Sequence, residues 1–319
     1  DQRNVLYRND GPGAGGSWSF SDVSASAGIA APVRSFPTWF FDYDNDGWLD
    51  LMVGSFADFS SVGLDLVVSD YLDLPTEGAR CRLYRNRGDG TFEDVSQRTG
   101  FDRVLLAMGA NFGDIDNDGF LDAYFGTGEP ALYTLVPNVM LRNDRGNRFQ
   151  DVTTSGGFGS IQKGHGIAFG DLDNDGDQDI YANMGGAYSG DVYQNVLFEN
   201  PGGGNRWITL RLEGVGSNRS AIGARVRLVV EEEDGKLREI HRVVGTGGSF
   251  GSSSLQLEIG LGRAARIASL EVHWPATGER SLYELLPLDR IVRIREGDPG
   301  LEIVDSAPVA LGGTAMHAH

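Results

Sequence analysis

The chain has 319 residues, of which 46 are Gly and 11 are Pro, and it carries a formal net charge of −18 at pH 7. Frequent Gly without frequent Pro is typical of short strands joined by tight turns. A surface this acidic repels phosphate, so we expect neither nucleic acid nor an anionic membrane surface as a partner.

No apolar run approaches the roughly 20 residues of a membrane-spanning helix, so no transmembrane segment is expected. Cys81 is the only cysteine, which rules out a disulfide within the chain. The chain starts at Asp1 without a signal-like apolar stretch, and removal of a leader is compatible with that start.

An acidic nonapeptide, DYDNDGWLD, occupies residues 42–50. It recurs as DIDNDGFLD at 114–122 and as DLDNDGDQD at 171–179, so the copies share the pattern D-x-D-x-D-G-x-x-D. Each copy precedes an apolar stretch that is typical of a buried strand. The pattern therefore marks a repeat, which is the first feature to establish when a fold is inferred.

Two further motifs recur between these copies. A leucine motif appears as LYRND, LYRNR, LRNDRG and LFEN, beginning at Leu6, Leu83, Leu141 and Leu197. The motif F-x-D-V begins at Phe20, Phe92 and Phe149, with the same spacings of 72 and 57 residues as the acidic copies. The unit is therefore about 57 residues long, and the extra residues of the first full copy fall most simply in 55–80.

Four short strands are predicted in each unit, and the best copy shows them as MGANFGD, LDAYFG, VMLRND and RFQDV. Four strands in roughly 40–60 residues are typical of a propeller blade. Residues 1–204 hold about three blades, whereas closed propellers need roughly four or more. We therefore expect an all-β fold with propeller-type blades in an incomplete or open ring.

After PGGG the acidic copies stop, and residues 205–297 show strand-like runs parted by Gly-rich or charged turns. These runs predict a separate all-β domain, sandwich- or barrel-like, in which we expect strands at WITLRLEG, AIGARVRLVV, LREIHRVVG, LQLEIGLG, IASLEVHWP and DRIVRIREG. Residues 298–319 are rich in Pro, Gly and Ala and are expected to form an extended arm or a loosely held terminus.

The spacing D-x-D-x-D-G reproduces the first half of a calcium loop, in which side chains at positions 1, 3 and 5 converge and Gly at position 6 permits a sharp turn. A backbone carbonyl at position 7 and an acid at position 9 complete the oxygen cage. The predicted carboxylate ligands are Asp42, Asp44, Asp46, Asp50, Asp114, Asp116, Asp118, Asp122, Asp171, Asp173, Asp175 and Asp179. Backbone carbonyls are expected from Trp48, Phe120 and Asp177.

Three Ca²⁺ sites are therefore predicted, because the loops hold hard oxygen donors and neither Cys nor paired His for zinc or copper. A metal-free polar turn is the alternative, which three copies in one register disfavour. Extracellular calcium modules bind at roughly 10⁻⁴–10⁻³ M, a concentration that cytosolic calcium does not reach. We therefore expect a secreted, periplasmic or cell-surface protein.

The unit F-G-D-x-D-N-D-G-x-x-D, with LYRN-x-G-D-G-x-F-x-D-V, resembles the FG-GAP/VCBS repeat of integrin-type propellers. The runs NRWITLRLEG, SNRSAIGARV, GTGGSFGSSS, LEIGLG and LEVHWPATGE resemble the ASPIC/UnbV domain. Together they are similar, over nearly the whole chain, to the family of cartilage acidic protein 1 and its bacterial homologues. The resemblance implies a calcium-stabilised propeller with a β-rich C-terminal domain in an exported protein.

Two functions remain open. The first is an interaction module that binds a protein or glycan partner, with assembly into homo- or hetero-oligomers, including a surface assembly, as a variant. The second is implied by the UnbV resemblance: a cofactor-free cyclase that forms a carbon–carbon bond in enediyne-type biosynthesis, with structural calcium and a small hydrophobic substrate. Known catalytic spacings are absent, so the first is preferred and enzymatic activity is left uncertain.

The weak candidate for catalysis is His165, in KGHGIAFGD. In a blade this position opens the innermost strand, where an imidazole can serve as a general acid or base. A His bonded to a backbone carbonyl is the preferred alternative. His241 and His273 lie in strand patterns and are predicted to be structural, and His317 and His319 lie in the predicted tail.

Overall fold

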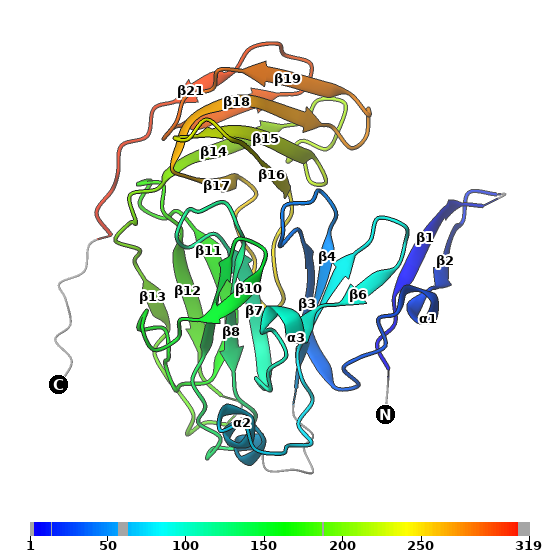
Figure 1. The fold of residues 1–319 in the computed structure, drawn as a ribbon, viewed down its shortest axis with the longest axis vertical. Helices are drawn as coiled ribbons and strands as arrows, with labels where there is room; N and C mark the ends of the chain where they lie inside the picture. Colours follow the sequence, from blue (N-terminus) through cyan, green and yellow to red (C-terminus); the bar gives the residue numbers. More distant parts are fainter. Residues whose placement is uncertain (1–2, 14, 57–62, 187, 312–319) are drawn as a thin grey trace.

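The computed structural model describes residues 3–13, 15–56, 63–186 and 188–311, so His317 and His319 lie outside the described residues. Within these ranges the fold is all-β, as predicted, with strands in six sheets (Figure 1). The helices are short: α1 (Ser24–Ala27), α2 (Gly63–Tyr71) and α3 (Ser96–Thr99). None of these helices has the length and apolarity required to cross a membrane.

Three sheets correspond to the repeat units, and in each the spatial order of the strands follows the sequence. Blade I consists of β3 (Ser35–Phe41), β4 (Asp50–Ser55), β5 (Arg82–Asn86) and β6 (Phe92–Asp94). Blade II consists of β7 (Ala107–Gly113), β8 (Asp122–Thr127), β9 (Val139–Asp144) and β10 (Arg148–Asp151). Blade III consists of β11 (Gly164–Gly170), β12 (Asp179–Met184) and β13 (Val196–Phe198). The four strands predicted for the best copy are thus confirmed.

A hairpin precedes the blades and projects away from them (Figure 1). Its strands are β1 (Tyr7–Pro12) and β2 (Trp18–Asp22). The hairpin repeats the outer half of a blade, because Asn9 lies opposite Phe20 as Asn86 lies opposite Phe92 in blade I. In the described part of the chain β1 and β2 pair only with each other.

The second domain is formed by two four-stranded sheets, ordered β17–β14–β20–β21 and β16–β15–β18–β19, which share one apolar core as in a sandwich. The first sheet contains β14 (Arg206–Glu213), β17 (Leu257–Gly262), β20 (Ile291–Arg295) and β21 (Glu302–Val304). The second contains β15 (Arg225–Glu232), β16 (Leu237–Val243), β18 (Ala264–His273) and β19 (Arg280–Glu284).

The sequence suggested three blades. Besides the hairpin, the described residues form five sheets of three or four strands, which is a larger number. Two of the five belong to the second domain. Strands β19 and β21 were not predicted, since both are short and lack a long apolar run. Strand β21 lies in the expected tail, where Ile303 is paired with Val292 of β20.

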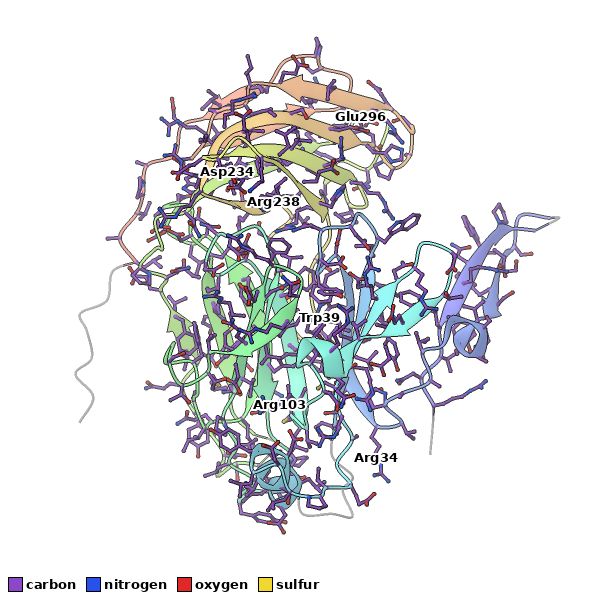
Figure 2. The ribbon with its side chains drawn as sticks, in the orientation of Figure 1. Arg34, Trp39, Arg103, Asp234, Arg238 and Glu296 are labelled. Atoms are coloured by element: carbon purple, nitrogen blue, oxygen red, sulfur yellow. The ribbon has the colours of Figure 1, made fainter. Side chains whose placement is uncertain are left out.

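Buried aromatic side chains hold the first two blades together. Side chains at alternate positions of a strand share one face, and Trp39 and Phe41 of β3 both point toward blade II. The Trp39 ring lies 5.8 Å from Phe112 and 5.9 Å from Phe125, and the Phe41 ring lies 5.5 Å from Phe112 (Figure 2). Pairs at such separations contribute about 0.5–1.5 kcal/mol each beyond area burial.

A glycine-rich loop of the second domain, residues 245–254, reaches the inner strands of the blades. Ser249 exchanges two backbone hydrogen bonds with Ala110 of β7, at 3.0 and 2.8 Å. Phe250 stacks on Phe36 of β3, with ring centroids 4.9 Å apart. The loop therefore bridges blades I and II.

The same loop also touches blade III. Gly251 approaches β11 so closely that a Cβ on it would lie 1.8 Å from the carbonyl oxygen of Ile167. Only Gly fits at such a contact. Inner strands line the axis of a propeller, and here a loop from the second domain joins the inner strands of three blades.

Candidate metal centres at the blade loops

Each acidic nonapeptide joins the two innermost strands of its blade, and we call the copies at 42–50, 114–122 and 171–179 loops I, II and III. The backbone curls at positions 4 and 6 of every copy, where φ is positive. Position 4 is Asn, with φ of 56°, 53° and 60° at Asn45, Asn117 and Asn174. Position 6 is Gly, with φ of 88°, 92° and 95° at Gly47, Gly119 and Gly176. Both residue types tolerate this left-handed region.

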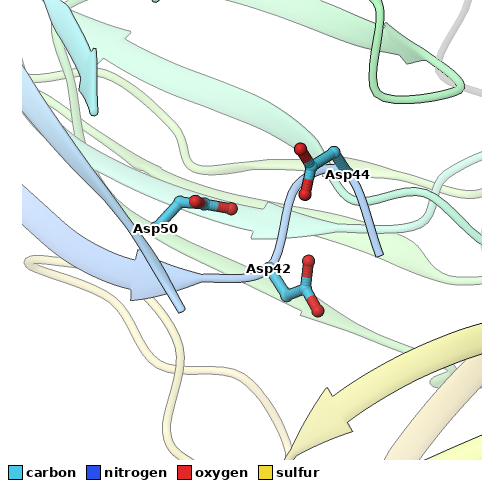
Figure 3. Close-up of side chains that lie close together, drawn as sticks. All are labelled: Asp42, Asp44 and Asp50. Carbon is cyan, nitrogen blue, oxygen red and sulfur yellow. The ribbon is translucent and has the colours of Figure 1, made fainter. Parts of the chain in front are cut away.

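The curl in loop I brings three carboxylates together. Oxygens of Asp42, Asp44 and Asp50 lie within 4.8 Å of one another, and the side chains point into a common space (Figure 3). Asp42 accepts the N–H of Gly47 at 2.8 Å, and Asp50 accepts the N–H of Tyr43 at 3.1 Å. These bonds fix the carboxylates from both ends of the loop.

The other loops form equivalent clusters, which consist of Asp114, Asp116 and Asp122 in loop II and of Asp171, Asp173 and Asp175 in loop III. In two of the three clusters a buried oxygen, Oδ1 of Asp44 or Oδ1 of Asp114, has no hydrogen-bond partner among the described residues. A buried polar atom without a partner costs about 1–3 kcal/mol, and more when it is charged. A cation at the centre of the cluster would remove that cost.

Burial also changes the protonation of these acids. It raises the pKa of Asp42 to about 7 and the pKa values of Asp50 and Asp114 to about 8, and neighbouring carboxylates add to each shift. The pKa of Asp171 rises to about 7 for the same reasons. Desolvation penalises the charged form, and a bound divalent cation would restore ionisation. The donor set contains only oxygen, so a hard cation such as Ca²⁺ or Mg²⁺ fits it.

Nine of the predicted ligands therefore lie in three compact clusters. The carboxylates of Asp46, Asp118 and Asp179 are not part of these clusters. The other predicted ligands are the backbone carbonyls of Trp48, Phe120 and Asp177, which the clusters of side chains do not test. Asp46 faces Arg85, with 2.6 Å between its oxygen and the guanidinium. Their coordination of a metal stays a prediction.

Loops I and II each face an arginine of the leucine motif, whereas loop III faces an acid. Arg85 Nε lies 2.7 Å from Asp44, and Arg142 Nε lies 3.5 Å from Asp116. The equivalent position beside loop III is Glu199, whose charge raises the pKa of Asp179. Loop III is therefore the most negative of the three.

The sequence predicted that the Asn at position 4 serves the turn. In the structure it also makes a hydrogen bond to the neighbouring loop. The side-chain amide of Asn45 donates to the carbonyl of Gly119 in the next loop at 2.8 Å. In the same way, Asn117 donates to the carbonyl of Gly176 at 2.9 Å. Each loop is thus bonded to the loop of the following blade.

The Asn of the leucine motif makes a second link, in the opposite direction, that the sequence reasoning missed. Asn143 donates to the carbonyl of Tyr43 in loop I at 2.8 Å, and Asn200 donates to the carbonyl of Ile115 in loop II at 2.8 Å. The recurrence of this Asn in every copy of the motif was the available signal.

The three loops also contact the second domain. The contacts are His241 N to Asn45 Oδ1 at 3.0 Å, Gly260 N to Asp114 Oδ2 at 3.1 Å, and Gln178 Nε2 to Glu258 Oε2 at 2.6 Å. The guanidinium of Arg238 lies 5.8 Å above the ring of Phe120 (Figure 2). The acidic loops therefore also take part in docking of the second domain.

His165 lies at the start of β11, where the sequence placed it. Its carbonyl oxygen is so close to β7 that a Cβ on Gly109 would lie 1.8 Å away. In the described part of the chain the imidazole makes no hydrogen bond, and its neighbour Lys163 is buried in an ion pair with Asp191 at 2.5 Å. His165 is absent from the lining of each of five hollows formed by the described residues.

The fold and the loops define a class: an all-β repeat protein whose small sheets are arranged as in a β-propeller, with Asp loops of the divalent-cation type and an appended β domain. Comparison with protein families identifies the parts. An FG-GAP-like repeat matches residues 64–125, and the ASPIC and UnbV domain matches residues 214–300. The chain thus contains an FG-GAP-like repeat and a C-terminal ASPIC/UnbV domain. No curated protein sequence matches it.

Proposed function

We propose that the protein is a calcium-stabilised interaction module that works outside the cytoplasm and binds a protein partner. The observation that carries the calcium part is the threefold recurrence of a buried carboxylate cluster in one backbone geometry. The unpaired oxygens of Asp44 and Asp114 support it, because a structure without a cation would leave them unsatisfied.

Calcium supports the extracellular assignment. Clusters of this kind in extracellular modules bind Ca²⁺ at roughly 10⁻⁴–10⁻³ M, far above the cytosolic concentration. A net charge of −18 would further destabilise a cation-free fold by repulsion between carboxylates. The secreted, periplasmic or cell-surface setting is therefore part of the same proposal.

The surface proposed for the partner is the β1–β2 hairpin. In blades I and II the strand equivalent to β1 also pairs with an inner strand, β4 or β8. Strand β1 has no such neighbour within the described residues, and Tyr7, Trp18 and Phe20 of the hairpin are exposed. The proposed occupant is an extended protein strand that adds to the free edge of β1, a common mode of recognition.

The calcium proposal is tested by thermal and urea unfolding in Ca²⁺, in Mg²⁺ and in EDTA. At about 2 mM Ca²⁺ and a Kd near 10⁻⁴ M, each site should add roughly 2 kcal/mol to the free energy of unfolding, by mass action. Asp114→Asn should remove about one such increment. Asp234→Asn is the control, because Asp234 lies in an exposed turn of the second domain and belongs to none of the three acidic clusters. Equal stability in Ca²⁺ and EDTA would refute the proposal.

The partner proposal has a separate test. A synthetic hairpin with the sequence of residues 107–127 contains no Trp. In a variant of the full chain that keeps Trp18 and has Phe at the other four Trp positions, the fluorescence of Trp18 reports binding of this hairpin. Saturable binding that is lost in Phe20→Ser and kept in Leu282→Ser is expected, since both side chains are exposed but only Phe20 lies on the hairpin. Binding unaffected by Phe20→Ser would refute strand addition at β1.

The cyclase alternative is carried by no observation of this kind, because His165 is absent from the lining of the same five hollows formed by the described residues.

A further inference from the structure

A cleft separates blades I and II from the sheet that contains β15 and β16. It consists of two adjoining hollows of about 140 and 180 Å³. The two hollows share the lining residues Phe40, Leu49, Phe112, Leu121, Arg242 and Val243. Because their linings overlap in this way, they form a single cleft between the domains.

The floor of the cleft is apolar. Phe40 is 46% exposed although it lies in a strand of blade I, and Leu49 and Phe112 are half-buried beside it. Apolar area that stays in contact with water costs about 25 cal/mol per Å² relative to burial. A compact apolar body in the cleft would therefore gain from covering this floor.

The wall opposite the floor is basic. In the sheet β16–β15–β18–β19, Arg225 lies opposite His273, Arg227 opposite His241, and His273 opposite Arg280. Residues directly opposite each other, and residues two apart on a strand, share one face. One sheet face thus presents three arginines and two histidines to the cleft, in a protein whose net charge is −18.

Two of the cleft arginines, Arg225 and Arg242, have at least one guanidinium nitrogen without a partner among the described residues. Arg225 makes no hydrogen bond or ion pair with any described residue, whereas Arg227 and Arg280 are paired with Glu239 and Glu271. Arg242 lines both hollows with a side chain only 5% exposed, and its Nε is buried and has no hydrogen-bond partner in the described ranges. The terminal nitrogens of Arg242 are bonded to Asn45, His241 and Gly119. One of them also lies 3.6 Å from Asp114. A buried unpaired guanidinium N–H favours an anionic acceptor.

We propose that this cleft binds a small amphipathic organic anion, a carboxylate carried on a compact apolar body. The apolar body covers Phe40 and Phe112, and the carboxylate faces Arg225 and Arg242. Four arginines and two acids, Asp42 and Glu271, line the hollow of about 140 Å³, so the lining is net positive. Each hollow is smaller than the roughly 300 Å³ at which drug-sized sites begin, which limits the ligand to a compact molecule.

A carboxylate is favoured over a neutral apolar ligand because the guanidinium of Arg225 and the Nε of Arg242 otherwise have no partner among the described residues. Planar guanidinium matches the carboxylate fork, and the bonds are charge-assisted and short. A nucleic-acid strand is disfavoured because the narrow cleft lies in a strongly acidic surface. The proposal is independent of the partner strand at β1.

The test uses naphthalene-2-carboxylate and its neutral isostere naphthalene-2-carboxamide as probes of the full chain. Binding is measured by isothermal titration calorimetry and by saturation-transfer NMR, in calcium-containing buffer. The acid should bind at least about tenfold more tightly than the amide, since a charge-assisted bond contributes about 1.5–3 kcal/mol. Equal affinities, or no binding of the acid at millimolar concentration, would overturn the proposal.

Variants locate the site. Arg225→Gln should weaken binding of the acid and leave binding of the amide unchanged, and Phe40→Ala should weaken both. The matched controls are Arg263→Gln, which removes an exposed arginine outside the cleft, and Leu237→Ala, which removes an exposed apolar side chain. Circular dichroism checks that each variant folds. An acid affinity that changes as much in Arg263→Gln as in Arg225→Gln would assign the effect to overall charge and overturn the site.

Discussion

Replacing Asn143 with Ala should lower the free energy of unfolding by about 3–4 kcal/mol, because three side-chain hydrogen bonds are lost at a fully buried site. Asn143 has 0% exposure. Its amide donates to the carbonyls of Tyr43 at 2.8 Å and Leu121 at 3.1 Å, and its oxygen accepts the N–H of Gly146 at 2.8 Å. Each bond contributes about 1 kcal/mol, and stranded buried partners add to the loss.

Asn86→Ala is the matched comparison, since Asn86 occupies the same position of the motif in blade I. It bonds only within its own blade, to Leu49 and Gly88 at 2.8 and 2.9 Å, and it is half-buried. The expected loss is about 1–2 kcal/mol. The assay is urea unfolding followed by near-UV circular dichroism in excess Ca²⁺. A loss in Asn143→Ala no larger than that in Asn86→Ala would refute the assignment of this Asn as a link between blades.

Three further outcomes are expected. Burial raises the pKa of Asp42 to about 7 and that of Asp50 to about 8. Without calcium the folded state therefore binds more protons than the unfolded state, and the melting temperature in EDTA should fall as the pH is raised from about 5 to about 8. A melting temperature that rises over this range would contradict the prediction. Glu199→Arg should weaken calcium binding at loop III about three- to tenfold, because it places a positive charge near the site. Isothermal titration calorimetry would detect this change as the loss of a high-affinity phase, and unchanged binding would exclude the charge effect. Gly251→Ala should lower the free energy of unfolding by about 2 kcal/mol or more, because the added Cβ clashes with β11. Gly245→Ala should change it little in the same urea titration, because no atom lies within 4 Å of the added Cβ. Equal losses would show that the loop does not depend on the close approach.

The repeats could be predicted because their signals are local. The period of the acidic motif and the alternation of apolar residues determine the strands of a blade without knowledge of distant contacts. The clusters around Asp42, Asp114 and Asp171 follow from spacing in the same way, because a curl of nine residues brings its own side chains together.

The links between loops could not be predicted from any single copy. The partner of Asn45 is Gly119 in the next loop, and the partner of Asn143 is Tyr43 in the preceding one. Such contacts depend on how the blades are placed in space. Strand β21 was missed for a similar reason, because three residues acquire strand geometry only by pairing with β20.

The second domain forms its own core and also packs against the inner strands of the blades. Few blades are present, so their inner strands would face open space without a further contact. The loop at 245–254 fills part of that space by joining Ala110 through backbone bonds and Phe36 through stacking. At the opposite end of the inner strands, loops I and II hold the same domain through Asn45 and Asp114. A cation that rigidifies these loops would therefore stabilise the contact between domains together with the blades, and calcium removal should loosen the interdomain cleft before either core unfolds.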